Sequence, residues 1–259
     1  VSSDPWNETM GFWKEKFVYY YGNEKYLLSL SISERIIEMN KTNPHGWLMR
    51  GICLLKLKRT HEAGFCLSQK FNNNNPDPLL SWLLGEYKEE TLNFSDAEQK
   101  YLDVPLTHMV YPVTQFSLAR LYCKQKRFWE SIEICDKVLE AYPVNTWALY
   151  YKGESLYGLG KIKEAFLSYN EACTNNPDYL PGCIKSARSL MKMGDYEKAD
   201  LVVSSVISKD DSNYDALRIK AFILLKRGKK KEACLFLEKM RQKNPGDQWT
   251  QKMLSLCSS

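Results

Sequence analysis

The chain has 259 residues, of which 44% are hydrophobic, so there is enough apolar material to bury a continuous core. Its formal net charge of +5 permits an acidic partner, but it falls short of a nucleic-acid-binding surface, which normally shows clustered Lys and Arg on one face. No apolar run reaches the ~18 residues that a membrane span needs. The one dense basic run, 226–231, falls at a predicted helix–helix turn and is interpreted as solvated.

Residues 10–43 are predicted to form two helices, over Met10–Tyr21 and Glu24–Asn40, separated by Gly22-Asn23. Asp4-Pro5 indicates a helix entry, with proline in the first turn. This part of the chain is unusually aromatic. One interpretation is that bulky rings fill the space between helices and cap the fold. The alternative is a sticky end that pairs with a second chain.

From residue 44 onward, small side chains recur every 34 residues. A fixed period in this range marks stacked repeats, and small side chains are needed where two antiparallel helices cross closely. The period divides this part into segments 44–77, 78–111, 112–145, 146–179, 180–213 and 214–247. One series of small residues is Gly51, Gly85, Ala119, Gly153, Ala187 and Ala221, and a second, 12 positions later, is Ala63, Ala97, Ser131, Ala165, Ala199 and Ala233.

These segments resemble the tetratricopeptide repeat (TPR) family. In segment 146–179 the family's signature places hold Gly153 at position 8, Leu156 at 11, Gly160 at 15, Ala165 at 20, Tyr169 at 24, Ala172 at 27 and Pro177 at 32. The turn glycine recurs as Gly194 and Gly228, and the closing proline as Pro143 and Pro245. The resemblance implies an all-α fold, a right-handed superhelical solenoid of helix-turn-helix repeats with a concave groove.

Three stretches depart from the regular repeat. Segment 10–43 is a diverged first repeat, with Phe17 at the small position 8. Segment 78–111 is degenerate, and Leu102–Pro112 predicts a distorted or shortened second helix. Residues 248–259 predict a capping helix. The tract Asn72–Pro76 predicts a polar turn at the end of its repeat. The whole chain is thus expected to be a single array.

In the family, the first helix of each pair lines the groove, chiefly through positions 2, 5, 9, 12 and 13. Large rings and basic side chains gather at these positions, and aromatic and Arg residues are typical of interface hot spots. The predicted partner-binding residues are Trp82, Glu86, Phe116, Arg120, Lys124, Trp147, Tyr150, Glu154, Tyr157, Arg188, Lys192, Arg218, Phe222 and Lys226. The lining favours a peptide or helix with apolar and acidic side chains.

One specialised TPR groove does not fit the residues present. Family members that clamp the C-terminal carboxylate of heat-shock chaperones need five Lys, Asn or Arg side chains at set positions. The corresponding places here hold Phe116, Arg120, Tyr151, Pro181 and Lys185, of which only Lys185 fits.

The eight cysteines show no CxxC pair and no spacing of zinc ligands. Those in predicted helices, Cys173 among them, are interpreted as free thiols that act as small apolar fillers. Scattered free thiols favour a reducing compartment, cytoplasm or nucleus. Three glycosylation sequons, at Asn7, Asn40 and Asn93, favour the secretory alternative, although such triplets often arise by chance.

Nothing in the sequence assembles a catalytic, metal or cofactor site. The three histidines lie far apart, no glycine-rich loop follows a strand, and Glu89-Glu90 is interpreted as a solvated face. The sequence therefore predicts a non-catalytic scaffold without cofactor, a subunit of a multiprotein complex, that binds a protein segment in its groove. The alternatives are a homodimer formed through the aromatic first repeat and, less favoured, an RNA-binding helical repeat.

Overall fold

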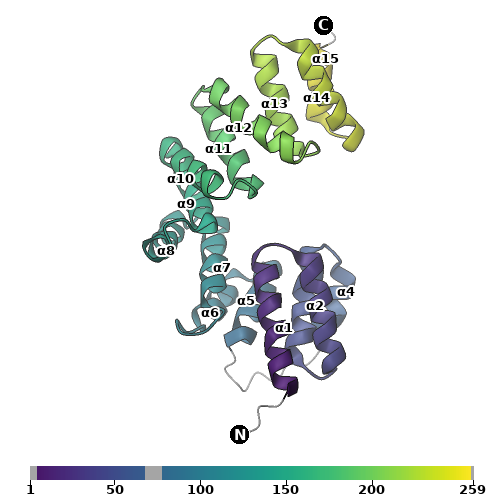
Figure 1. The fold of residues 1–259 in the computed structure, drawn as a ribbon, viewed down its shortest axis with the longest axis vertical. Coiled ribbons are helices and arrows are strands. Elements are labelled where there is room, and N and C mark those ends of the chain that lie inside the picture. The colour runs from purple at the N-terminus through teal and green to yellow at the C-terminus, as the bar shows by residue number, and fades with distance from the viewer. Residues whose placement is uncertain (1–4, 68–77, 258–259) are drawn as a thin grey trace. The chain divides into compact units, whose positions relative to one another are not determined.

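The computed structural model describes residues 5–67 and 78–257. Asp4, the tract Asn72–Pro76 and the last two residues of the expected capping helix lie outside the described residues, as does the side chain of Asn7. Within the described ranges the chain forms fifteen α-helices (Figure 1) and no β-strand, so the all-α class is confirmed. The chain divides into two compact units, residues 1–121 (unit 1) and 122–259 (unit 2).

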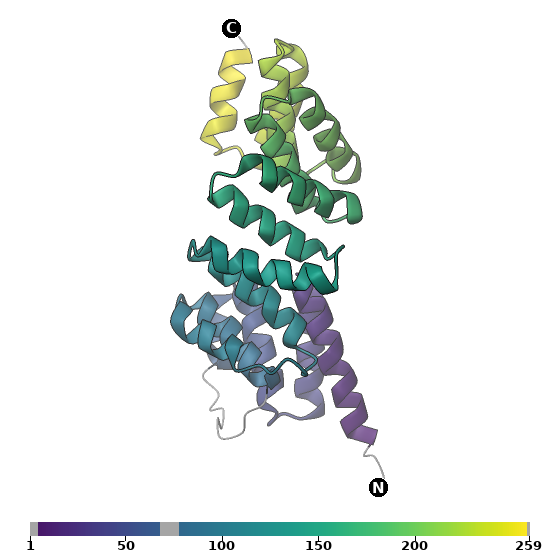
Figure 2. The ribbon, with the colours of Figure 1, turned by 90° about the vertical axis from the view of Figure 1, so that its left-hand side faces the viewer.

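Within each unit the helices follow one another as short antiparallel pairs, each packed on the next, as seen for unit 2 in Figure 2. Unit 1 contains α1 (Pro5–Gly22), α2 (Tyr26–Met39), α3 (Pro44–Lys56), α4 (Thr60–Leu67), α5 (Pro78–Glu90), α6 (Phe94–Leu102) and most of α7 (Tyr111–Lys124). Unit 2 contains α8 (Phe128–Ala141), α9 (Thr146–Gly158), α10 (Ile162–Asn175), α11 (Leu180–Lys192), α12 (Tyr196–Lys209), α13 (Tyr214–Lys226), α14 (Lys230–Lys243) and α15 (Gln248–Cys257).

The turn inside each pair has one residue in the left-handed conformation. Its φ is +78° at Gly160, and Lys161 N–H then reaches back to the carbonyl of Leu156 at 2.9 Å, which ends the first helix. Glycine adopts this conformation without steric cost, whereas other residues adopt it with strain. The positive φ recurs at every 34th residue, at Glu24, Lys58, Leu92, Lys126, Gly160, Gly194 and Gly228. Sequence reasoning recognised only the three glycines.

The small residues lie where the helices of a pair cross. All twelve are buried. At Gly153, an added Cβ would stand 2.6 Å from the Tyr169 ring, which leaves no room for a side chain. The 34-residue series therefore sets the distance between paired helices through close packing, as the sequence predicts.

The second helix of segment 78–111 is short. α6 ends at Leu102 after nine residues, and turns fill 103–110 before α7 begins at Tyr111. Val104 and Val110 are nevertheless buried, so this irregular stretch contributes to the core of unit 1. The expected irregularity at Leu102–Pro112 thus falls on 103–110, while Tyr111 and Pro112 already belong to α7.

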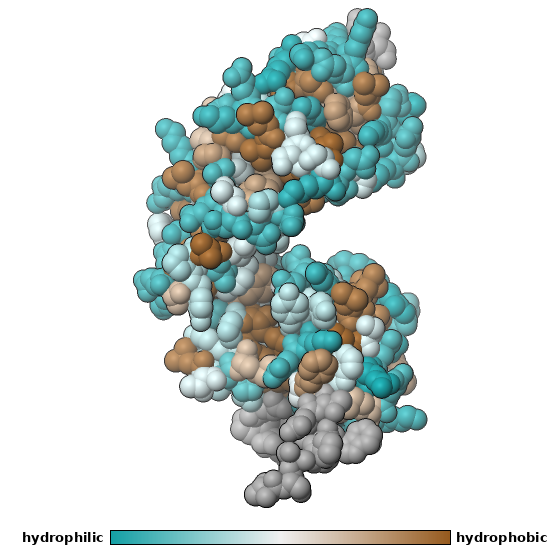
Figure 3. Space-filling model, in the orientation of Figure 1, coloured by the Kyte–Doolittle hydropathy of each residue, from teal (hydrophilic) through white to brown (hydrophobic). Residues whose placement is uncertain are grey.

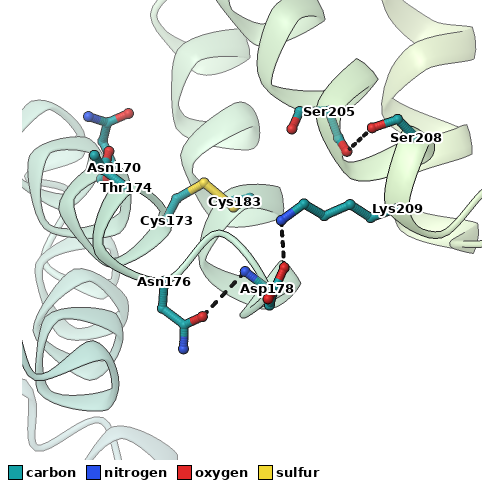
Figure 4. The surroundings of a disulfide bond; sticks show 9 residues. All are labelled: Asn170, Cys173, Thr174, Asn176, Asp178, Cys183, Ser205, Ser208 and Lys209. Carbon is teal, nitrogen blue, oxygen red and sulfur yellow. Dashed lines mark hydrogen bonds and ion pairs between the residues drawn. A yellow bond between two sulfur atoms is a disulfide. The ribbon is translucent and has the colours of Figure 1, made fainter.

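One sequence prediction about cysteine is wrong. Cys173 in α10 is bonded to Cys183 in α11, with their Cα atoms 4.8 Å apart (Figure 4). The two helices pack on each other, so their cysteines meet across a repeat boundary that a 10-residue separation without a CxxC pattern does not reveal. The ion pair Lys209–Asp178 lies in the same region, at 2.6 Å. Because these two cysteines are not free thiols, they do not support the expected reducing compartment.

Replacing both Cys173 and Cys183 by serine is expected to lower the stability of unit 2 by ~2–3 kcal/mol under oxidising conditions, the value for closing a loop of this size. Chemical denaturation with and without dithiothreitol measures the effect. The reductant is expected to shift the wild-type midpoint and to leave the double variant unchanged. An equal response of both proteins, or no bridged peptide in non-reducing mass spectrometry, would contradict the bond.

Candidate functional site

Four of the predicted groove residues lie in the core of unit 1 instead of on an open surface. Trp82 and Glu86 are 0% exposed, Phe116 is 7% exposed and Arg120 is 9% exposed. The prediction that these side chains face a partner is therefore wrong. The reason is that α1, α5 and α7 approach each other closely enough to fill the space between them. The Tyr21 ring of α1 contacts the Trp82 ring with centroids 5.4 Å apart.

A charged network fills this interior. Arg120 Nη2 lies 2.6 Å from Glu86 Oε1 and 2.8 Å from Glu89 Oε2, and its Nε donates to Glu89 Oε1 at 2.9 Å. Glu86 also accepts hydrogen bonds from hydroxyl groups of three helices. The donors are Tyr21 at 2.8 Å, Tyr101 at 2.9 Å and Ser117 at 2.6 Å. Every carboxylate oxygen of Glu86 and Glu89 thus has a partner, which is what burial of charge requires.

The network keeps the Glu86 carboxylate ionised. Burial opposes the charged form of Glu86, but Arg120 and Lys56 outweigh it and hold the pKa of this carboxyl well below its usual range. Burial and the neighbouring Glu86 raise the pKa of the Tyr101 hydroxyl, which remains a hydrogen-bond donor. The network is consequently structural.

The interpretation of Glu89-Glu90 as a solvated face is wrong. Glu89 is 1% exposed and belongs to the network around Arg120. Glu90 is only partly exposed, and its Oε1 pairs with Lys56 Nζ at 2.6 Å. A helix surface in an ordinary repeat would be solvated at these positions, whereas the tight packing of α1, α3, α5 and α7 covers them.

In unit 2, the predicted groove residues in the first part of the unit do not line a common pocket with the later ones. Glu154 accepts from the Tyr169 hydroxyl at 2.5 Å and pairs with Lys185 at 2.7 Å, so its carboxylate is already engaged within the chain. Tyr150 packs its ring against Tyr169 and Tyr179. Lys124 is exposed and Trp147 half-buried, and neither lines the pocket described next.

The other predicted residues of unit 2 converge. A pocket of about 540 Å³ opens between the first helices of successive repeats, within the size range of ligand sites in proteins. Five of its nine lining residues were predicted from the repeat register: Tyr157 from α9, Arg188 and Lys192 from α11, and Arg218 and Phe222 from α13. The remaining lining residues are Met191, Tyr196, Ile219 and Trp249.

Cations lie over the aromatic rings of the pocket. Lys192 Nζ stands 4.7 Å from the Tyr157 ring centroid, and the Arg218 guanidinium carbon lies 4.6 Å from that of Trp249. Lys226 Nζ, just beside the pocket, lies 5.6 Å from the Phe222 centroid. Cation–π contacts of this kind orient a charge above an apolar wall. Hydrophobic side chains lie among hydrophilic ones on the visible surface of unit 2, as Figure 3 shows.

Sequence reasoning missed the wall contributed by α15. Trp249 was recognised only as an apolar residue of the tail, because the family's groove positions apply to complete repeats. The start of α15 is fixed by Asp247, which accepts from Thr250 N at 3.0 Å, from the Thr250 hydroxyl and from the Tyr214 hydroxyl of α13. This N-terminal cap holds Trp249 beside α13.

The cap makes the α15 wall sensitive to acid. The hydrogen bonds from Thr250 and Tyr214 lower the pKa of Asp247 to about 2 from its ordinary value of 3.8. A carboxyl whose pKa is lowered by folding stabilises the folded state at every pH above its ordinary pKa. This stabilisation is lost as the pH falls through the lowered pKa.

We therefore expect α15 to loosen between about pH 4 and pH 2. Amide signals of 248–251 in a proton–nitrogen NMR titration measure this. Asp247→Asn should abolish the acid step, and a step centred at 3.8 in the wild type would contradict the cap.

No helix within 5–67 and 78–257 is long and apolar enough to cross a membrane. Across the same ranges, no three His, Cys, Asp or Glu side chains gather as a metal site would require.

Two family models match parts of the sequence. The model described as tetratricopeptide repeat matches residues 116–179, and the one described as coatomer epsilon subunit matches residues 154–256. Among solved structures, a TPR protein from Parabacteroides merdae matches 97% of this chain and 100% of its own, with 13% identity and a TM-score of 0.61. Residues 116–179 thus match the tetratricopeptide repeat family, and the chain has the fold of tetratricopeptide repeat proteins.

Two further solved structures have the same fold as this chain. A thermophilic TPR protein from Thermus thermophilus is 16% identical, with a TM-score of 0.54, over 70% of this chain and 99% of its own. The Cut9–Hcn1 hetero-tetramer of the APC/C contains a chain with a TM-score of 0.69 and 13% identity, over 96% of this chain and 48% of that one. No curated protein matches the sequence.

Proposed function

We propose that this TPR protein is a non-catalytic scaffold, a subunit of a multiprotein complex, that holds a segment of a partner protein in the pocket of unit 2. The observation that carries the proposal is the convergence of Tyr157, Arg188, Lys192, Arg218 and Phe222 on one hollow, since aromatic and arginine side chains are enriched at binding hot spots. The same positions of unit 1 are filled by its own side chains, so unit 2 is the part that offers a lining to a partner.

The comparisons support a role in an assembly. The match to the coatomer epsilon subunit model, residues 154–256, spans all nine residues that line the pocket. One similar structure is that of a hetero-tetramer. These likenesses favour a subunit over a free enzyme but name no partner for this chain.

Affinity purification from native cells, followed by mass spectrometry, tests the proposal. The triple variant Arg188→Gln, Lys192→Gln and Arg218→Gln removes the three cations of the pocket. It is expected to lower recovery of the principal partner about tenfold or more, the loss that removal of hot-spot side chains produces.

A matched control removes the same charge from the second helices of the three repeats whose first helices line the pocket. Lys163, Lys198 and Lys239 lie on α10, α12 and α14 and are exposed, so their change to Gln is expected to leave recovery unchanged. Circular dichroism should show that both variants fold. Equal recovery with the two triple variants would contradict the pocket as the binding site.

A second candidate is self-association through the first repeat. Large apolar side chains of α1 and α2 are exposed there, with Leu27 at 70%, Tyr19 at 62% and Phe12 at 50%. Exposed apolar side chains of this size favour contact with another chain. Sizing chromatography with light scattering decides this, because a monomer at all concentrations would exclude a dimer, whereas a dimer should dissociate on Leu27→Ser.

A further inference from the structure

The Arg188–Asp215 ion pair joins a lining residue of the unit 2 pocket to a side chain outside its lining. Asp215, on α13, places Oδ1 2.5 Å from Arg188 Nη2 on α11. Both side chains are substantially exposed, at 40% for Arg188 and 52% for Asp215. An exposed pair of this kind contributes only about 0–1 kcal/mol, so an external carboxylate can replace the internal one at little cost.

The other two pocket cations have no such internal partner. Among the described residues, no carboxylate lies within ion-pair distance of Lys192 or Arg218, which are held instead over the rings of Tyr157 and Trp249. Arg218 is near enough to Asp247 to help lower the pKa of that carboxyl, after Thr250 and Tyr214. The lining of the pocket thus combines three cations with apolar side chains that include Met191, Ile219 and Phe222.

We infer that the pocket takes a partner segment with one bulky apolar side chain flanked by carboxylates, and that Asp215 occupies the position on Arg188 that a carboxylate of this segment takes. This inference rests on the proposed function of the same site. The apolar side chain enters between α11, α13 and Trp249, and its acidic neighbours pair with Arg188, Arg218 and Lys192. Asp215 competes with the ligand and limits its affinity, because like charges repel and Arg188 Nη2 is already paired.

Three nine-residue synthetic peptides serve as probes for the full chain. The first has a phenylalanine flanked on each side by two aspartates, the second has asparagines in place of the aspartates, and the third has glycine in place of the phenylalanine. Each carries fluorescein, and its anisotropy is measured against increasing protein concentration up to the millimolar range. We expect the first to bind more tightly than the other two and to weaken as salt is raised.

The variant Asp215→Asn tests the competition directly. It should tighten binding of the acidic phenylalanine peptide about two- to fivefold, the range that release of an exposed ion pair allows, and leave the asparagine peptide unchanged. Asp211→Asn is the matched control. It removes the same charge four residues away, where Asp211 is 77% exposed and pairs with Lys239 of α14, outside the pocket.

Two results would overturn the inference. One is weaker binding with Asp215→Asn, or an effect equal to that of Asp211→Asn, since Asp215 would then not compete for Arg188. The other is that the acidic and asparagine peptides bind equally well, or that neither binds at protein concentrations up to the millimolar range. If the pocket variants still lose the cellular partner in that case, the scaffold function stands and only the ligand chemistry is wrong.

Discussion

Replacing Arg120 by methionine is expected to lower the free energy of unfolding of unit 1 by about 3–5 kcal/mol. Methionine is close to arginine in length, so the change removes the charge and leaves little cavity. The loss arises because Glu86 and Glu89, 0% and 1% exposed, would lose the guanidinium that contacts three of their four carboxylate oxygens. Buried ionised groups without a partner are among the most destabilising features a fold can contain.

Urea denaturation followed by circular dichroism measures this effect, with the unit 1 transition analysed separately because two units need not unfold together. Arg35→Met is the control within unit 1, since Arg35 pairs with Glu38 at 58% and 66% side-chain exposure, and exposed pairs contribute about 0–1 kcal/mol. The triple change Arg120→Met, Glu86→Gln and Glu89→Gln removes all three charges and keeps acceptors for the Tyr21, Tyr101 and Ser117 hydroxyls, so it should recover part of the loss. A loss below about 1 kcal/mol for Arg120→Met would contradict the burial of this network.

The substitution Gly153→Leu is expected to destabilise unit 2 by roughly 1–3 kcal/mol or more. The first atom of the new side chain would stand 2.6 Å from the Tyr169 ring, so α9 and α10 must separate or the ring must move. Movement of the ring would also break the hydrogen bond from the Tyr169 hydroxyl to Glu154. Overpacking and a lost buried interaction therefore act in the same direction.

Thermal unfolding of wild type and variant gives the measurement. The matched control is Gly64→Leu in α4, because an added Cβ there meets nothing within 4 Å. Leucine has a higher helix propensity than glycine, so the control is expected to be neutral or slightly stabilising. If the two leucine substitutions lowered the melting temperature equally, close crossing of α9 and α10 at Gly153 would be refuted.

The local features of the fold were predictable because they repeat. Each helix pair needs a small residue where its helices cross and a turn residue in the left-handed conformation. These features therefore recur every 34 residues, and the series that contain Gly153 and Ala165 reveal the crossings. The same register located Leu102–Pro112 as irregular. What it could not reveal was the four non-glycine turn residues such as Lys126, since nothing in lysine marks a positive φ.

The interior of unit 1 was not predictable from the register. Tyr21 meets Glu86 across 65 positions of sequence, and this contact depends on how closely successive pairs pack, which no single repeat encodes. The positions that line a groove in the family therefore became core. In unit 2 five residues at these positions did converge on one pocket. Trp249 was missed because it lies on α15, after the last predicted repeat, and the Cys173–Cys183 bond was missed because its spacing matches no motif.

The hydrogen bond from Tyr21 in the first repeat to Glu86 in the third has a consequence for cooperativity. In a linear array each repeat contacts only its neighbours, so the terminal repeat frays first and its amides exchange fastest with deuterium. Here the end of α1 is tied to α5, and α5 is tied to α7 through Trp82 and Ser117. The last turn of α1 cannot open without removing a donor from a buried carboxylate, so its amides should be protected together with those of α5.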